Sequence, residues 1–195
     1  MPERGRTFEQ VVQRAATQHG YVRTADLVDL GIDEVYLRRL AADGRAEHRG
    51  RGLYRLVALP VTEFDEYQEA VMWAGDGAAI GGEAALVLWE LADVNPRRIE
   101  VVIPPGRRLR RRGADRYRLK TEKLTPAEID FVDGIPVARP DVAIRQVIEG
   151  GTEGSLVEQA ITNANRRNLL KPLAEARLRV ALADRNVDRQ KQRAR

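Results

Sequence analysis

The amino-acid sequence predicts an α+β protein of two domains, and three observations lead to this fold class. Residues 1–60 contain three short helical patterns separated by glycines, followed by two short strands around a turn. Residues 61–185 alternate helical patterns with strands, as a mixed α/β domain does. Leu59-Pro60 falls between the two patterns. We therefore expect one domain over residues 1–60, a second over 61–185 that folds alone, and a basic tail over 186–195.

Each expected helix of the first domain ends at a glycine. Each expected helix begins at a capping side chain and ends at a glycine: Thr7 to Gly20, Thr24 to Gly31 and Asp33 to Gly44. Two strands follow at residues 45–48 and 53–56, joined by a turn at 49–52. Three small helices and a two-stranded wing make a winged helix-turn-helix, in which the second and third helices are the central pair.

The third helix and the wing are rich in arginine. Leu37 and Leu40 point inward, so Arg39 faces outward at the helical angle of about 100° per residue. In a helix-turn-helix the second helix of the pair enters the major groove, where a guanidinium can hold guanine with two hydrogen bonds. Arginines on the wing would meet phosphates or a minor groove. The DNA-binding candidates are therefore Tyr36, Arg38, Arg39, Arg45, Arg49 and Arg51. The alternative is a wing that only packs, with solvated arginines.

The second domain is expected to contain several helices and a sheet. Helical patterns cover residues 63–74, 81–89, 140–149, a stretch from 155 onward, and 172–185, and strands are expected at 79–80, 99–103, 117–121 and 135–137. Thr125 and Ser155 each precede a glutamate by three residues, so both fit a capping box at a helix start. Strands 99–103 and 117–121 are expected to be joined by a hairpin-like connection, and the tail from Asn186 to fray.

Charge is strongly segregated, although the net charge is only +4. Residues 37–55 hold six arginines against two acids, and residues 63–103 hold nine acids against two arginines. Residues 106–120 then hold seven arginines and one lysine against a single aspartate. A basic front, an acidic middle and a basic loop indicate two different contact surfaces, although a run of charge is also typical of a solvated face.

Composition excludes several classes of protein. The chain has no cysteine, which excludes disulfides, thiol nucleophiles and thiolate metal sites. The first ten residues lack the apolar segment of a secretory signal, and the longest apolar stretch, residues 84–91, is too short to span a membrane. We therefore expect a cytoplasmic protein without a membrane partner.

An enzyme is the least favoured class of function. The only histidines are His19 and His48, one at a helix end and one in the wing, and we expect both to be structural or near DNA. Neither a zinc-type cluster nor a phosphate-binding loop is present. A metal nuclease would commonly place lysine two residues after a strand carboxylate, but Val102 stands there after Glu100. We expect no catalytic residue, no metal and no cofactor.

A pattern of glycine, leucine and arginine positions in residues 20–54 resembles the winged helix of AbiEi-type antitoxins. Its most telling parts are Gly31-Ile32, Gly44 and the run Arg51-Gly52-Leu53-Tyr54. The run Ile80-Gly81-Gly82-Glu83-Ala84-Ala85-Leu86 and the later Gly134-Ile135-Pro136-Val137 before Arg139-Pro140 are similar to the domain that follows the winged helix in that family. The MenA antitoxins of mycobacteria, relatives of AbiEi, have the same arrangement, namely a winged helix followed by a mixed α/β antitoxin domain.

The resemblance implies an antitoxin that counteracts a nucleotidyltransferase-fold toxin encoded beside it. Many such antitoxins also repress their own operon by binding promoter DNA through the winged helix, and a homo-oligomer on DNA stays open. The toxin's metal-binding carboxylates would complement a basic loop. The toxin-binding candidates are Arg107, Arg108, Arg110, Arg111 and Arg112, with a second DNA contact or a solvated loop as alternatives. The alternative function is a free-standing winged-helix transcriptional regulator whose second domain dimerises or senses a ligand.

Overall fold

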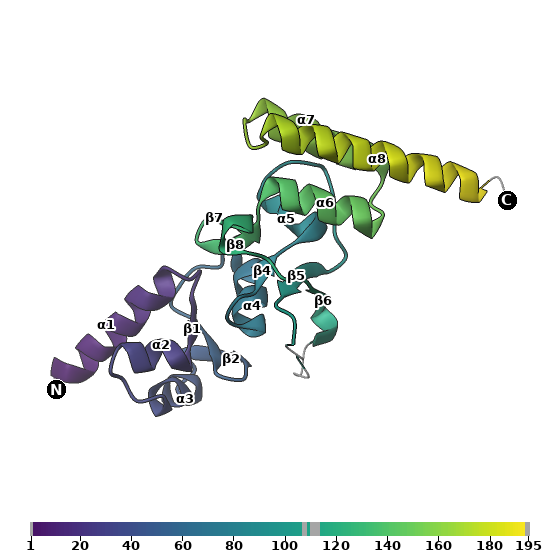
Figure 1. The fold of residues 1–195 in the computed structure, drawn as a ribbon. Coiled ribbons are helices and arrows are strands. Elements are labelled where there is room, and N and C mark those ends of the chain that lie inside the picture. Colours follow the sequence, from purple (N-terminus) through teal and green to yellow (C-terminus); the bar gives the residue numbers. More distant parts are fainter. Residues whose placement is uncertain (1, 107–108, 110–113, 194–195) are drawn as a thin grey trace.

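The computed structural model describes residues 2–106, 109 and 114–193, and these form an α+β fold with two sheets (Figure 1). The winged helix lies at one end of the molecule and the last two helices lie at the other. The five arginines expected to bind a toxin lie outside the described residues.

The first domain has the predicted order of three helices and a wing. Its elements are α1 (Pro2–Ala16), β1 (Tyr21–Arg23), α2 (Thr24–Asp29), α3 (Val35–Ala42), β2 (Ala46–Gly50) and β3 (Leu53–Leu56). The three strands form an antiparallel sheet in the order β1-β3-β2. Val11, Leu27, Leu37, Leu40 and Leu56 are among the side chains of its buried core.

Two of the three capping predictions in this domain are wrong. Thr7 lies inside α1, because the helix already begins at Pro2, a residue whose fixed φ suits the first helical position. Thr24 is the first residue of α2, and the carboxylate of Asp26 accepts the Arg23 N–H at 2.7 Å in its place. The prediction for Asp33 is confirmed, since its Oδ1 accepts the backbone N–H of Val35 at 2.8 Å.

The second domain is built around a mixed five-stranded sheet. In chain order its elements are α4 (Asp65–Ala74), β4 (Ala79–Ile80), α5 (Gly82–Leu88), β5 (Ile99–Ile103), the 3-10 turn η1 (Ala114–Arg116), β6 (Tyr117–Thr121), the 3-10 turn η2 (Pro126–Glu128), β7 (Ile129–Val132), β8 (Ile135–Ala138), α6 (Pro140–Gly150), α7 (Gly154–Arg166) and α8 (Pro172–Arg193). The strand order is β6-β5-β4-β8-β7. Helices α5 and α6 lie between the sheet and the α7–α8 pair (Figure 1).

The predicted hairpin between β5 and β6 is wrong. The two strands pair in parallel, with Ile99 opposite Tyr117 and Ile103 opposite Thr121. In a parallel pair the second strand begins at the same end as the first, so a hairpin turn cannot join β5 to β6. Local alternation in each strand cannot distinguish the two pairings.

Three expectations about helix ends also change. Thr125 does form a capping box, since its N–H and hydroxyl donate to Glu128 Oε2 at 2.9 and 2.8 Å, but the element is only the short turn η2. The prediction of a capping box at Ser155 is wrong, because α7 begins at Gly154 and the Ser155 hydroxyl donates to Glu153. The prediction that the chain frays from Asn186 is also wrong, because α8 continues to Arg193.

Two arginines hold the later turns of α8 against the rest of the domain. Arg185 donates to the carbonyl oxygen of Ile148 at 3.1 Å, and Arg189 donates to that of Gly151 at 2.6 Å. Both carbonyls lie at the end of α6, where backbone oxygens have no partner within the helix. A cationic side chain is also favoured at a helix C-terminus. These contacts explain why the polar end of the sequence stays helical.

The glycine pair at the start of α5 allows that helix to approach β5 closely. A Cβ on Gly81 would lie 2.5 Å from Val102 Cγ2, and one on Gly82 would lie 2.6 Å from Glu100 Oε1. Gly82 also has a positive φ of 55°, which favours glycine. Its backbone N–H donates to the buried Gln146 side chain at 2.8 Å. The conformation and close packing therefore require glycine here.

Candidate nucleic-acid interface

Helix α3 presents the outward face expected of a recognition helix. Leu37 and Leu40 are buried in the first-domain core, which directs Arg38 and Arg39 to the solvent. Tyr36 is half-buried and packs against the same core. Arg38 lies 3.8 Å from Glu34 one turn earlier, and both side chains are exposed. Such an exposed pair contributes little, so Arg38 remains able to bind elsewhere.

Arg39 and Arg51 are exposed cations on α3 and on the turn of the wing. Neither forms an ion pair or a hydrogen bond with its side chain within the part of the chain that the structure describes. A solvated guanidinium loses little when it exchanges water for a phosphate or a base edge. These two side chains are therefore the best placed of the six candidates to bind DNA.

Arg45 combines packing with an exposed charge. Its guanidinium carbon lies 3.7 Å from the centre of the Phe8 ring on α1, which is a cation–π contact. The side chain is nevertheless exposed. The contact fixes the guanidinium beside the first helix and leaves its outer edge available to an anion.

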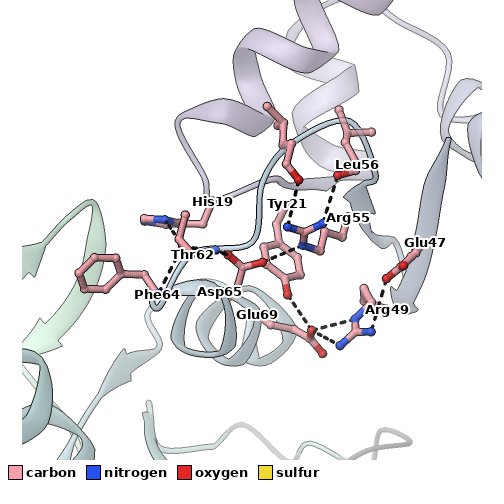
Figure 2. Close-up of polar contacts among 11 residues, drawn as sticks. His19, Tyr21, Glu47, Arg49, Arg55, Leu56, Thr62, Phe64, Asp65 and Glu69 are labelled. Atoms are coloured by element: carbon pink, nitrogen blue, oxygen red, sulfur yellow. Dashed lines mark hydrogen bonds and ion pairs between the residues drawn. The ribbon is translucent and has the colours of Figure 1, made fainter.

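Arg49 differs from the other candidates because it reaches the second domain. Its Nε and Nη2 lie 2.9 and 2.8 Å from Glu69 Oε2 on α4, and Glu47 lies 3.6 Å away (Figure 2). Burial lowers the pKa of Arg49, but the hydrogen bond to Glu69 and the negative charges nearby, that of Glu69 first, together outweigh burial and raise the pKa. The guanidinium is thus engaged with a carboxylate, and its first role is to attach the wing to α4.

Glu69 is the centre of this attachment. Its side chain is only 4 % exposed, and it accepts a hydrogen bond from the Tyr21 hydroxyl at 2.9 Å. Arg116, which directly precedes β6, donates to its other oxygen at 2.6 Å. Burial, and then the Glu69 charge, raises the pKa of Tyr21, so this tyrosine stays a neutral donor. One carboxylate therefore connects β1, the wing and the residue that precedes β6.

Near the Arg49–Glu69 contact, a second arginine–carboxylate pair joins the two domains, and both of its side chains are buried (Figure 2). Arg55 of β3 donates to Asp65 of α4 at 2.7 Å, and the two side chains are 10 % and 7 % exposed. Thr62 donates both its N–H and its hydroxyl to Asp65 at 2.6 and 2.9 Å. Burial alone would raise the pKa of Asp65, but the bonds from Thr62 and Arg55 outweigh it and lower the pKa.

Further contacts close the junction between the domains. The His19 ring nitrogens lie 3.1 Å from Thr62 Oγ1 and 2.9 Å from the Asp133 carbonyl oxygen, so this histidine links the turn after α1 to the second domain. Tyr21 and Leu53 of the first domain belong to the buried core of the second. Sequence reasoning missed this junction. The available signal was α4, where Asp65, Gln68 and Glu69 are polar at helical spacing and all are buried.

The described residues contain neither a metal-binding cluster nor a membrane-spanning helix. Among them, no group of three or more histidine, aspartate or glutamate side chains is placed to hold a metal ion. Within the same ranges, no helix combines the length and the apolar character needed to cross a membrane.

Comparison with known proteins supports the winged-helix assignment. Residues 9–57 match the model of a family described as "Transcriptional regulator, AbiEi antitoxin", which confirms the resemblance predicted for this part of the chain. The fold is similar to the crystal structure of the RV2827C protein from Mycobacterium tuberculosis, with a TM-score of 0.54. The two share 16% sequence identity over 92% of this chain and 76% of that one, a likeness that concerns the fold alone. No curated protein matches the chain.

Proposed function

We propose that this protein is an antitoxin that counteracts a nucleotidyltransferase-fold toxin encoded beside it and represses their operon by binding promoter DNA. The observation that carries the proposal is the match of residues 9–57 to AbiEi antitoxin regulators, on a domain whose α3 and wing carry exposed arginines. The protein acts by binding, without catalysis and without a cofactor. Its place of action is the cytoplasm, where its promoter lies.

The DNA contacts divide between base edges and phosphates. Arg39 lies on the outer face of α3, where it would reach base edges in the major groove. Arg51, at the turn of the wing, and Arg45, beside Phe8, would bind phosphates. Tyr36 and Arg38 flank Arg39 and would position the helix. Arg49 contributes indirectly, because it holds the wing on Glu69.

Replacing Arg39 with alanine is expected to relax sequence preference at one base pair by about 1–3 kcal/mol, because a bidentate base contact is lost.

Arg51→Ala is expected to weaken binding to all DNA sequences equally, because one phosphate contact is lost. The slope of log affinity against log salt concentration should also fall by about one. Gel-shift titrations of promoter and scrambled DNA at several salt concentrations measure both effects. Arg166→Ala, which removes an exposed charge on α7, is the matched control. Unchanged promoter affinity in the Arg39→Ala/Arg51→Ala variant contradicts the proposed interface.

Toxin binding is proposed for the basic loop, residues 106–113. Burying five unpaired arginines would be very costly, so we expect these side chains to face water or an acidic surface. The metal-binding carboxylates of a nucleotidyltransferase would supply such a surface. Arg116, three residues after this stretch, donates a hydrogen bond to Glu69, which also binds Arg49 of the wing.

Charge reversal in the loop separates toxin docking from DNA binding. Arg110→Glu together with Arg111→Glu is expected to reduce co-purification with the product of the adjacent gene at least about tenfold, because like charges then face each other. Promoter binding should persist, because the winged helix is unchanged. An unaltered toxin complex would remove the loop from the interface, and lost promoter binding would assign it to DNA instead. If no nucleotidyltransferase-like gene lies beside this one, the free-standing regulator becomes the better reading.

A further inference from the structure

The outer face of α8 carries a regular stripe of exposed apolar side chains. Leu173, Val180 and Val187 are 64 %, 61 % and 47 % exposed, and they recur every seven residues. Leu178 and Leu182, which pack into the core, lie on the opposite side of the helix. At about 100° per residue, the stripe is roughly half a turn away from these buried leucines. The exposed stripe therefore has no role in packing α8 onto its own chain.

A shallow groove of about 350 Å³ lies in the middle of this stripe. It is lined by Ala176, Arg177, Val180, Ala181 and Asp184. Small alanines on both sides of a valine allow another helix to approach closely. A repeat of seven residues is also the spacing at which two helices keep a common seam. The face thus has the shape and period of a helix-packing surface.

The charges beside the stripe indicate which helix would fit. Arg177 and Asp184 are exposed, seven residues apart, on the same edge of the stripe. Within the described residues neither side chain has an ion-pair partner, whereas Arg179 on the same helix binds Glu175 and Glu158. A second α8 running antiparallel would place its Asp184 opposite Arg177 and its Arg177 opposite Asp184. The face is therefore complementary to itself in charge.

We propose that two copies of this chain associate through α8 in an antiparallel pair with a two-fold axis at Val180. In that register Val180 meets its own copy, and Leu173 of each chain meets Val187 of the other. Such an isologous contact uses one patch twice, as two-fold dimers do. In a parallel pair the repeat would not bring Arg177 to Asp184, so the charges select the antiparallel arrangement.

The position of α8 keeps this contact separate from the candidate nucleic-acid interface. Helix α8 lies at the end of the molecule far from α3 and the wing (Figure 1). The stripe from Leu173 to Val187 is about 21 Å long at 1.5 Å per residue. An interface of that length is small, so we expect association at micromolar concentrations instead of a permanent dimer. The proposal does not depend on DNA or toxin binding.

Sedimentation equilibrium of the full chain from about 1 to about 100 μM tests the association, since small interfaces populate dimers in this range. The wild-type chain is expected to pass from monomer to dimer, and Val180→Glu to raise the dissociation constant at least about tenfold, because the substitution places two carboxylates on the axis. Val61→Glu changes an exposed valine away from α8 and should leave the constant unchanged. A wild-type chain that stays monomeric throughout, or an equal effect of both variants, overturns the proposal.

A charge swap tests the orientation of the pair. Arg177→Asp or Asp184→Arg alone should weaken the dimer, because like charges then face each other across the axis. The double variant should restore it to within about twofold, because both pairs are re-formed in reverse. Failure of the double variant to recover rules out the proposed register.

Cysteine cross-linking gives an independent reading, because the natural chain contains no cysteine. Val180→Cys should form a covalent dimer on mild oxidation, since each cysteine faces its copy. Leu173→Cys alone should not, because it faces Val187, but Leu173→Cys together with Val187→Cys should. Cross-linking of Leu173→Cys alone would indicate a parallel pair and overturn the proposal.

Discussion

Replacing Asp65 with asparagine is expected to lower the free energy of unfolding at neutral pH by about 3 kcal/mol, because it leaves a buried arginine without its counter-charge. Arg55 and Asp65 are 10 % and 7 % exposed and lie 2.7 Å apart, so water cannot replace the lost charge. Arg55 would then have only neutral acceptors, among them the carbonyl oxygens of Leu56 and Leu59, each at 3.3 Å. Denaturant unfolding, followed by tryptophan fluorescence, measures the change.

Two further variants identify the cause of the loss. Arg55→Met in the Asp65→Asn background should recover part of the stability, because no unpaired charge then remains. Glu158→Gln breaks an ion pair with Arg179 in which both partners are about half exposed, and should change the stability by less than about 0.5 kcal/mol. An equal loss in Glu158→Gln and Asp65→Asn would contradict the argument from burial.

The same pair predicts a specific dependence on pH. The pKa of Asp65 is lowered in the folded protein by its bonds to Thr62 and Arg55, which outweigh burial. A carboxyl with a depressed pKa contributes stability that is complete above its unfolded value of about 3.9 and is lost as the pH falls through the folded value. Wild type and Asp65→Asn should therefore converge in stability below about pH 4. A constant difference down to the acid transition would contradict this.

The elements of this fold were largely predictable from sequence, because their signals are local. Asp33 caps α3, Gly44 follows it with a positive φ of 69°, and Leu37 and Leu40 repeat on the buried face. These interactions join residues a few positions apart. The parallel pairing of β5 and β6 could not be predicted in the same way, because the alternation within each strand is identical in both directions of pairing.

The candidate site was predictable only in part, because the function of an arginine depends on what lies opposite it. Arg39, Arg49 and Arg51 are equivalent in the sequence pattern, yet only Arg49 meets the buried Glu69, twenty residues further along the chain. The same limit applies to Arg55, because in the sequence its partner Asp65 is only one of the nine acids in residues 63–103. The available indication of a buried polar junction was on α4, where Asp65, Gln68 and Glu69 recur at helical spacing among apolar side chains.

Removing residues 1–60 is expected to destabilise the remaining domain by about 4 kcal/mol or more, although the sequence pattern predicts that residues 61–185 fold alone. The cut removes Tyr21 and Leu53 from the core that surrounds Trp73, which leaves a cavity or exposes apolar surface. It also removes Arg55 and Arg49, so Asp65 and Glu69 each lose the arginine with which they form an ion pair. Thermal unfolding and soluble yield of residues 61–193, compared with the full chain, measure the effect.

A charge-neutral version of the fragment separates the two causes of this loss and decides what the junction does. Asp65→Asn with Glu69→Gln in residues 61–193 should recover part of the stability, because it removes the carboxylates that have lost Arg55 and Arg49, while the lost packing of Tyr21 and Leu53 remains. If the unmodified fragment melts cooperatively within a few degrees of the full chain, the domains are independent and the junction only orients them. In that case the fragment should also protect cells from the toxin without binding promoter DNA. If the neutral fragment folds but does not protect, the winged helix itself takes part in neutralisation, because the fold of the second domain is then intact.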